Sequence, residues 1–177
     1  MSPDALNAEE LTDHVDEIVD QWTRERPDLD VSGMAIIGRL GRLERAIRAR
    51  LDVVFAMHDL EAWEFDVLAT LRRHGEPHRL TPGELLESMM VTSGAMTNRI
   101  DRLEGRGFVR RSKSPTDGRQ VLVQLTPAGF DKVEAAVADH AANELTLIDV
   151  LDPGQRDQLI ELLRLLHHGV VVASADS

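Results

Sequence analysis

Five arginines fall within seventeen residues of a chain whose formal net charge is −11. The segment reads AMTNRIDRLEGRGFVRR and covers residues 95–111. Guanidinium groups could bind nucleic-acid phosphates, pair with bases, or hold a small anion through planar bidentate contacts. From residue 94 to 124 the basic residues exceed the acids by 4, whereas the rest of the chain carries −15. This basic island favours a DNA-reading module on an acidic scaffold, although a solvated surface patch would have the same charge.

The helical period separates the residues of segment 93–106 into two faces. Met96, Ile100 and Leu103 share one apolar face, which predicts that this face packs on the core. The opposite face carries small, amide and basic side chains, which suit close approach to base edges and phosphates. Together with the hairpin described below, the residues predicted to contact DNA are Ser93, Gly94, Ala95, Thr97, Asn98, Arg102, Lys113, Asp117 and Arg119.

Arg99 lies at the boundary between the two faces, so it is poorly aimed at a DNA groove. Two interpretations stay open for this arginine. It could turn inward to hold an anion, or it could run along the core and pair with a nearby acid such as Asp101 or one near Glu104.

Two capped helices with a short gap predict a helix-turn-helix. Thr81 as N-cap, Pro82 at the first helical position and Glu84 three residues after the cap form a capping box. Thr92 or Ser93 could cap a second helix that runs to residue 106 and is stopped by a glycine. In a helix-turn-helix the second helix lies in the major groove.

A β-hairpin is predicted directly after the second helix. Residues 108–113 and 120–125 have strand-like patterns, and SPTDGR between them is rich in turn formers. Arg119 at the tip could enter a minor groove with Asp117 holding its guanidinium, as in a wing. The alternative is a plain turn with an exposed arginine.

The remaining segments are helical, so the predicted fold class is mainly α with a small β-hairpin wing. Apolar spacing predicts helices over 5–24, 31–58, 61–75, 127–150 and 155–171. Glycines 33, 38 and 41 could mark close helix packing. We expect a single domain over 1–177, in which 5–58 and 127–172 are dimerisation helices and 60–126 is the winged helix-turn-helix. The last helix is so apolar that one small domain could hardly bury all of it, which predicts that it packs against a partner surface.

Several other classes of protein are disfavoured. The chain has no cysteine, so disulfides, thiolate metal sites and cysteine nucleophiles are not available. The histidines show no metal-ligand spacing, and a nucleophile elbow and a Gly-rich phosphate loop are both missing, so we expect no enzyme, no metal and no cofactor. The acidic start is unlike a signal peptide and apolar runs are short, so a cytoplasmic location without membrane contact is expected.

The segment MTNRIDRLEGRGFVRRSKSPTDGRQVLVQLTPAG, residues 96–129, resembles the signature of the MarR family of winged helix-turn-helix regulators. The resemblance extends over residues 31–170 and includes Leu-Glu-Gly at the end of the recognition helix, the DGR wing tip and LTPAG. It implies a homodimer that binds a pseudo-palindromic double-stranded DNA operator. It also implies that the protein is usually a repressor, which a small ligand releases.

A narrower resemblance is to the urate-responsive branch, which has an additional N-terminal helix. Its ligand residues correspond here to Trp22, Asp66, Arg99 and Arg111. The implied mechanism is that Trp22 and Arg99 hold an anionic effector such as urate, whose charge pushes on Asp66. That displacement would be relayed to the recognition helix, with Arg111 stabilising the pocket.

Alternatives remain for this site and for the protein. Trp22 could be a core residue, and Asp66 and Arg111 could form an internal salt bridge. The four residues would also suit other carboxylate or purine-like anions. A helical scaffold that binds only protein is the other alternative to a DNA-binding regulator.

Overall fold

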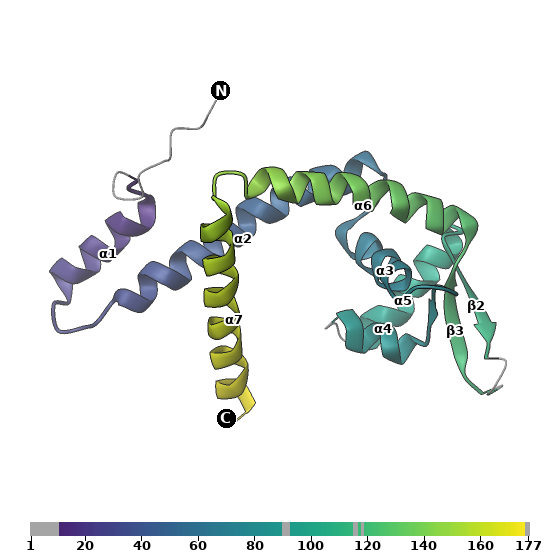
Figure 1. Cartoon of the computed structure of the whole chain (residues 1–177). Coiled ribbons are helices and arrows are strands. Elements are labelled where there is room, and N and C mark those ends of the chain that lie inside the picture. The colour runs from purple at the N-terminus through teal and green to yellow at the C-terminus, as the bar shows by residue number, and fades with distance from the viewer. Residues whose placement is uncertain (1–10, 90–92, 115–116, 118, 176–177) are drawn as a thin grey trace. The chain divides into compact units, whose positions relative to one another are not determined.

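The structure is a computed structural model that describes residues 11–89, 93–114, 117 and 119–175. The described chain is mainly helical with a small antiparallel sheet, which confirms the predicted fold class. Its elements, shown in Figure 1, are α1 (His14–Glu25), α2 (Ser32–Met57), α3 (Ala62–Arg73), β1 (Arg79–Leu80), α4 (Pro82–Met89), α5 (Ser93–Gly105), β2 (Val109–Lys113), β3 (Val121–Leu125), α6 (Pro127–Leu147) and α7 (Pro153–Ala175).

The chain divides into two compact units. Residues 45–143 form one unit, which holds α3, α4, α5, the three strands, the second half of α2 and most of α6. Residues 1–44 and 144–177 form the other, which holds α1, the first half of α2 and α7. The predicted helix-turn-helix and hairpin therefore fall within one unit.

The helix-turn-helix begins with the predicted capping box. The Thr81 backbone N–H donates to Glu84 Oε2 at 2.7 Å, and the Glu84 N–H donates to Thr81 Oγ1 at 3.2 Å. Gly107, just after α5, has a φ of 76°, a left-handed value that glycine adopts without strain. Of the two candidate caps for α5, Thr92 and the side chain of Ser93 lie outside the described residues.

The hairpin is part of a three-stranded sheet with strand order β1-β3-β2. β2 pairs with β3 over residues 109–113 and 121–125, as predicted. β1 was not predicted; Arg79 pairs with Gln124 and Leu80 with Val123. This short strand directly precedes α4, so its pairing with β3 ties the start of the helix-turn-helix to the hairpin.

The buried face of α5 is the one that the helical period predicts. Met96, Ile100 and Leu103 are at most 2% exposed and belong to one core with Leu68 of α3 and Val123 of β3. Burial of these side chains determines which side of α5 is left to face outward.

The other unit has a different N-terminal boundary from the predicted one. α1 begins at His14, because the Asp13 side chain accepts from the backbone N–H groups of the first turn, so the predicted start at residue 5 is wrong. Val15 packs on Gly38 of α2, where an added Cβ would lie 3.2 Å from a Val15 methyl carbon. A Cβ added at Gly33 or Gly41 would meet no atom of another described element within 4 Å, so only Gly38 among these three fits the predicted close packing. No helix in the described ranges is long and apolar enough to cross a membrane.

Candidate nucleic-acid interface and adjoining pocket

The outward face of α5 presents the exposed side chains of Thr97 and Asn98. By the helical period, Asn98 lies opposite the buried Met96 and Ile100, and Thr97 flanks this outward face. The backbones of residues 93–95 form the first turn of α5, but their side chains lie outside the described residues. The predicted DNA contacts of this turn therefore stay predictions.

Arg102 lies on the exposed side of α5 and is already engaged within the protein. Its Nη2 donates to Glu61 Oε1 at 2.5 Å, and its guanidinium carbon lies 4.6 Å from the centre of the Trp63 ring. Its side chain is nevertheless 53% exposed. Arg102 is thus braced against the start of α3 rather than extended into solvent.

The wing carries the other predicted DNA-binding side chains. Lys113 at the end of β2 is exposed, as are Asp117 and Arg119 near the tip. Asp117 Oδ1 accepts from the backbone N–H of Arg119 at 3.0 Å. The described contact between the two residues thus orders the backbone before β3, whereas the sequence predicted a contact with the guanidinium.

Arg111 on β2 is clamped between two carboxylates of α5. Its Nη2 donates to Asp101 Oδ1 and its Nη1 to Glu104 Oε2, each at 2.5 Å. Its backbone N–H also donates to Glu104 Oε1 at 2.8 Å, and this bond, followed by the Arg111 guanidinium, lowers the pKa of Glu104. Arg111 therefore forms internal salt bridges with these two acids of α5, and the alternative pairing of Arg111 with Asp66 is wrong.

Arg106 ties the end of α5 to the start of α3. Its Nη1 donates to Glu64 Oε2 at 2.6 Å, and its Nη2 donates to the backbone oxygen of Asp59 at 2.7 Å and to its Oδ2 at 2.6 Å. Glu64 is only 1% exposed. Sequence reasoning missed these partners of Arg102 and Arg106. The acids in DLEAWE were visible, but nothing local indicates that α3 and α5 lie side by side.

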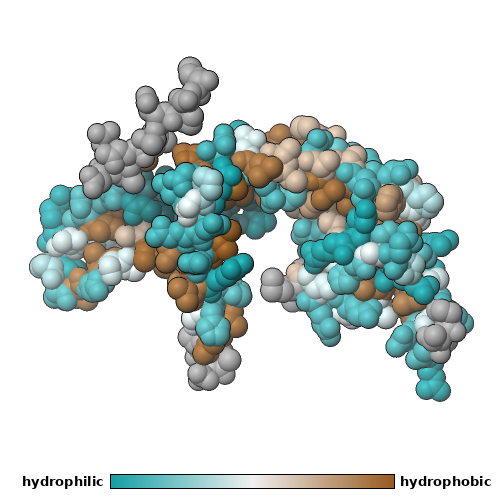
Figure 2. All heavy atoms as spheres, viewed as in Figure 1, coloured by the Kyte–Doolittle hydropathy of each residue, from teal (hydrophilic) through white to brown (hydrophobic). Residues whose placement is uncertain are grey.

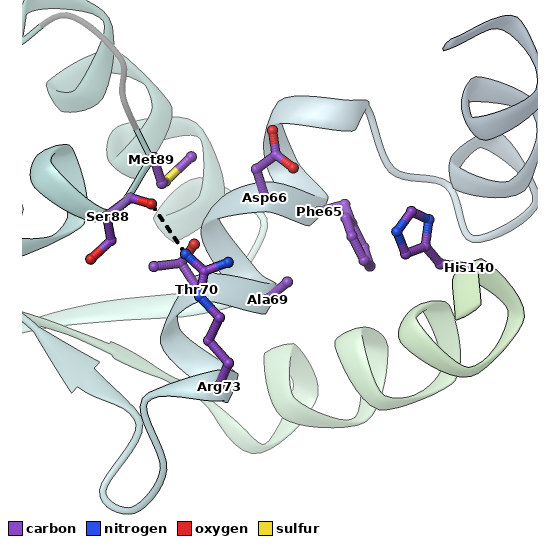
Figure 3. A pocket seen from close by; sticks show the side chains of 8 residues that line it. All are labelled: Phe65, Asp66, Ala69, Thr70, Arg73, Ser88, Met89 and His140. Carbon is purple, nitrogen blue, oxygen red and sulfur yellow. Dashed lines mark hydrogen bonds between the residues drawn. The ribbon is translucent and has the colours of Figure 1, made fainter. Parts of the chain in front are cut away.

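A pocket of about 320 Å³ lies between α3, α4 and α6 (Figure 3). Its lining residues are Phe65, Asp66, Ala69, Thr70, Arg73, Ser88, Met89 and His140. The Phe65 ring lies 4.8 Å from the His140 ring, and Arg73 Nη2 donates to the Ser88 carbonyl at 3.1 Å. The pocket therefore combines an aromatic wall with cationic and acidic groups, a combination that suits a small, planar, polar molecule.

Asp66 and Arg99 act on each other electrostatically. Partial burial of the carboxylate raises the pKa of Asp66, although the residue is exposed, because crowded protein atoms replace water around it. The interactions that oppose this shift come, largest first, from Arg99, His140, Arg73 and Arg48. The guanidinium carbon of Arg99 lies 5.8 Å from the centre of the Trp63 ring. Two of the four predicted ligand residues thus lie near each other on α3 and α5.

The other two predicted ligand residues are placed differently. Arg111 is held by α5 and does not line the pocket. Trp22 belongs to the other compact unit and is 44% exposed. Their roles toward a ligand stay predictions. In the part of the chain that the structure describes, no group of three or more histidine or acidic side chains could hold a metal ion.

Comparison with known proteins agrees with this arrangement. Residues 60–121 match the MarR family. The regulator PecS of Dickeya dadantii is 42% identical over 152 residues, which cover 86% of this chain and 90% of PecS. The chain belongs to the MarR family. This MarR-family protein is a DNA-binding transcriptional regulator and not an enzyme, as the sequence predicted.

Similar solved structures support the same conclusion. A MarR variant from E. coli complexed with operator DNA superposes with a TM-score of 0.66 at 27% identity, covering 88% of this chain and 99% of that one. Bordetella bronchiseptica BpsR, whose DNA binding is regulated by 6-hydroxynicotinic acid, superposes with a TM-score of 0.59 at 28% identity, covering 73% and 98%. The similarity to BpsR and E. coli MarR extends well beyond the winged helix-turn-helix.

Proposed function

We propose that this MarR-family protein is a homodimeric repressor that a small anionic ligand releases from its operator. The main support for release by a ligand is the electrostatic interaction between Arg99 and Asp66. Asp66 lines the pocket and Arg99 lies on the recognition helix, so the interaction links the pocket to that helix. An anion beside Arg99 would repel the Asp66 carboxylate and compete with it for the guanidinium. Ligand binding would then bias the position of α5.

Urate is the first ligand to test, and other carboxylates or purine-like anions form the second class. Trp22 and Arg99 would supply a stacking face and a planar cation for urate. BpsR responds to 6-hydroxynicotinic acid, which is an aromatic carboxylate with a hydroxyl substituent. An aromatic wall of Phe65 and His140 is compatible with both classes of planar ligand.

A second copy of the chain would cover the apolar side chains that α7 exposes in the single chain (Figure 2). They are Leu159, Ile160, Leu162, Leu163, Leu165, Leu166, Val170, Val171 and Val172. Monomeric proteins rarely leave so many large apolar side chains of one helix in water. A twofold dimer would also present two recognition helices to a pseudo-palindromic operator.

The test is a titration of fluorescent DNA from upstream of the protein's own gene, with and without urate. We expect binding that weakens with salt, prefers this DNA over a scrambled sequence and is reversed by urate or by one of a panel of carboxylates. Sedimentation should give a dimer, and a reporter gene should be expressed more strongly when the ligand is added. Operator binding that no planar anion weakens would contradict the ligand-released mechanism.

A further inference from the structure

The exposed position of Arg102 on α5 is that of a DNA contact, but its partners lie within the protein. Its guanidinium bonds to Glu61 at 2.5 Å and lies over the Trp63 ring at 4.6 Å. Glu61 is the N-cap residue of α3, so this contact joins the recognition helix to the start of a neighbouring helix.

The Glu61 carboxylate has a second hydrogen-bond partner besides Arg102. The Trp63 indole N–H donates to Glu61 Oε2 at 2.7 Å, which leaves Oε1 for Arg102. The bond from Trp63, followed by that from Arg102, lowers the pKa of Glu61. The carboxylate therefore stays ionised at neutral pH and can hold a cation.

Two arginines of α5 lie over the Trp63 ring. Arg102 lies over it at 4.6 Å and Arg99, one helical turn earlier, at 5.8 Å. Cation–π contacts at a partly exposed ring are individually weak, but here two of them come from successive turns of one helix. A change in the rotation of α5 would disturb both contacts and the bond to Glu61.

We propose that Arg102 is a positioning residue, which sets the orientation of α5 on α3 through Glu61 and Trp63 instead of contacting DNA itself. This inference rests on the family's DNA binding and does not depend on the identity of the ligand. It replaces one predicted DNA contact with a brace that determines how Asn98 and Thr97 meet the bases.

The experiment compares Glu61→Gln, Arg102→Gln and the double variant in operator titrations at several salt concentrations. If Arg102 is a positioning residue, each single variant lowers affinity about two- to five-fold, the range that exposed ion pairs contribute, and the double variant is no worse than either single one. The slope of log affinity against log salt should stay as in the wild type, because no phosphate contact is lost.

A DNA-contacting Arg102 gives the opposite pattern. Glu61→Gln would then free the arginine and leave affinity unchanged or increased, and Arg102→Gln would reduce the salt slope by about 0.9. Either result overturns the proposal. Glu87→Gln, which removes an exposed acid of α4, is the matched control for the change in charge and should not lower affinity.

Fluorescence supplies a readout that needs no DNA. The chain has 2 tryptophans, so in a Trp22→Phe background all tryptophan emission comes from Trp63. Arg102→Gln and Glu61→Gln should each shift that emission, whereas Glu87→Gln should not. Emission that is unchanged in both variants would mean that the brace is not formed in solution and would overturn the proposal.

Discussion

Arg106 donates a hydrogen bond at 2.6 Å to Glu64, a carboxylate that is 1% exposed. Removing the cation would leave this carboxylate buried and without its counter-charge, which is costly. We expect Arg106→Ala to lower the free energy of unfolding by about 2–3 kcal/mol in urea denaturation, somewhat below a fully buried pair because Arg106 is 30% exposed. Arg110→Ala is the control and should stay within about 0.5 kcal/mol. Equal effects of both substitutions would show that the Arg106 pair is not structurally important.

Gly129 in the first turn of α6 lies against the backbone of Phe108. A Cβ at this position would fall 1.9 Å from the Phe108 carbonyl oxygen, so the backbone has to move. Gly129→Ala should therefore destabilise the protein by about 2–3 kcal/mol, as overpacking does. Gly105 in α5 has open space, and Gly105→Ala should be neutral or stabilise by about 0.5 kcal/mol. Denaturation midpoints of the two variants that move together would refute this distinction.

The raised pKa of Asp66 predicts a stability effect whose sign depends on pH. A carboxyl group with a raised pKa in the folded state favours protonation, so the folded protein loses stability as pH rises from the ordinary value of about 3.9 through the raised one. Asp66→Asn should therefore be more stable than the wild type at pH 7, by up to about 0.5 kcal/mol at this exposed position. The difference should disappear at pH 3. A variant that is less stable at pH 7 would indicate that the ionised carboxylate is favoured in the fold.

Arg119 near the wing tip is one of the side chains that the sequence predicts to contact DNA. It is exposed, and Asp117 orders its backbone without a described bond to its guanidinium. Arg119→Ala should weaken operator binding and lower the salt slope by about 0.9, the loss of one phosphate or minor-groove cation. Lys113→Ala provides a second wing variant for comparison. An unchanged slope in Arg119→Ala would argue that the wing tip stays off the DNA.

Arg99→Ala and Trp22→Phe separate ligand response from DNA binding. Both should leave operator affinity within about two-fold and raise the urate concentration needed for release, because neither residue is on the outward face of α5. Titrating urate into the preformed complex measures this. Loss of operator binding in Arg99→Ala with unchanged ligand affinity would instead assign Arg99 to DNA recognition.

The sequence predicted those features that depend on local pattern. The Thr81 capping box, the apolar face of α5 and the β2–β3 hairpin all follow from residues close together in the chain, and all are confirmed. β1 was missed because two residues give no strand period, and it exists only by pairing with β3. The start of α1 was misplaced because the apolar spacing continues N-terminal to Asp13, whereas Asp13 is the N-cap and the helix begins after it.

The partners of the arginines were beyond local pattern. Arg102, Arg106 and Arg111 meet acids 41, 42 and up to 10 residues away, so their partners depend on how the helices and the hairpin pack. A helical wheel shows which way a side chain leaves the helix, but a long guanidinium can bend back to a neighbour. Charge and direction alone therefore do not show which arginines are paired within the protein.

The internal pairing of these arginines has a consequence for how the regulator would search a genome. Arg102, Arg106 and Arg111 are largely neutralised by carboxylates on α3 and α5. A surface with few unpaired cations would bind random DNA weakly and dissociate from it quickly, since non-specific affinity comes almost entirely from phosphate contacts. Few copies of the protein would then be held on irrelevant sites, and a modest preference for the operator could suffice for occupancy.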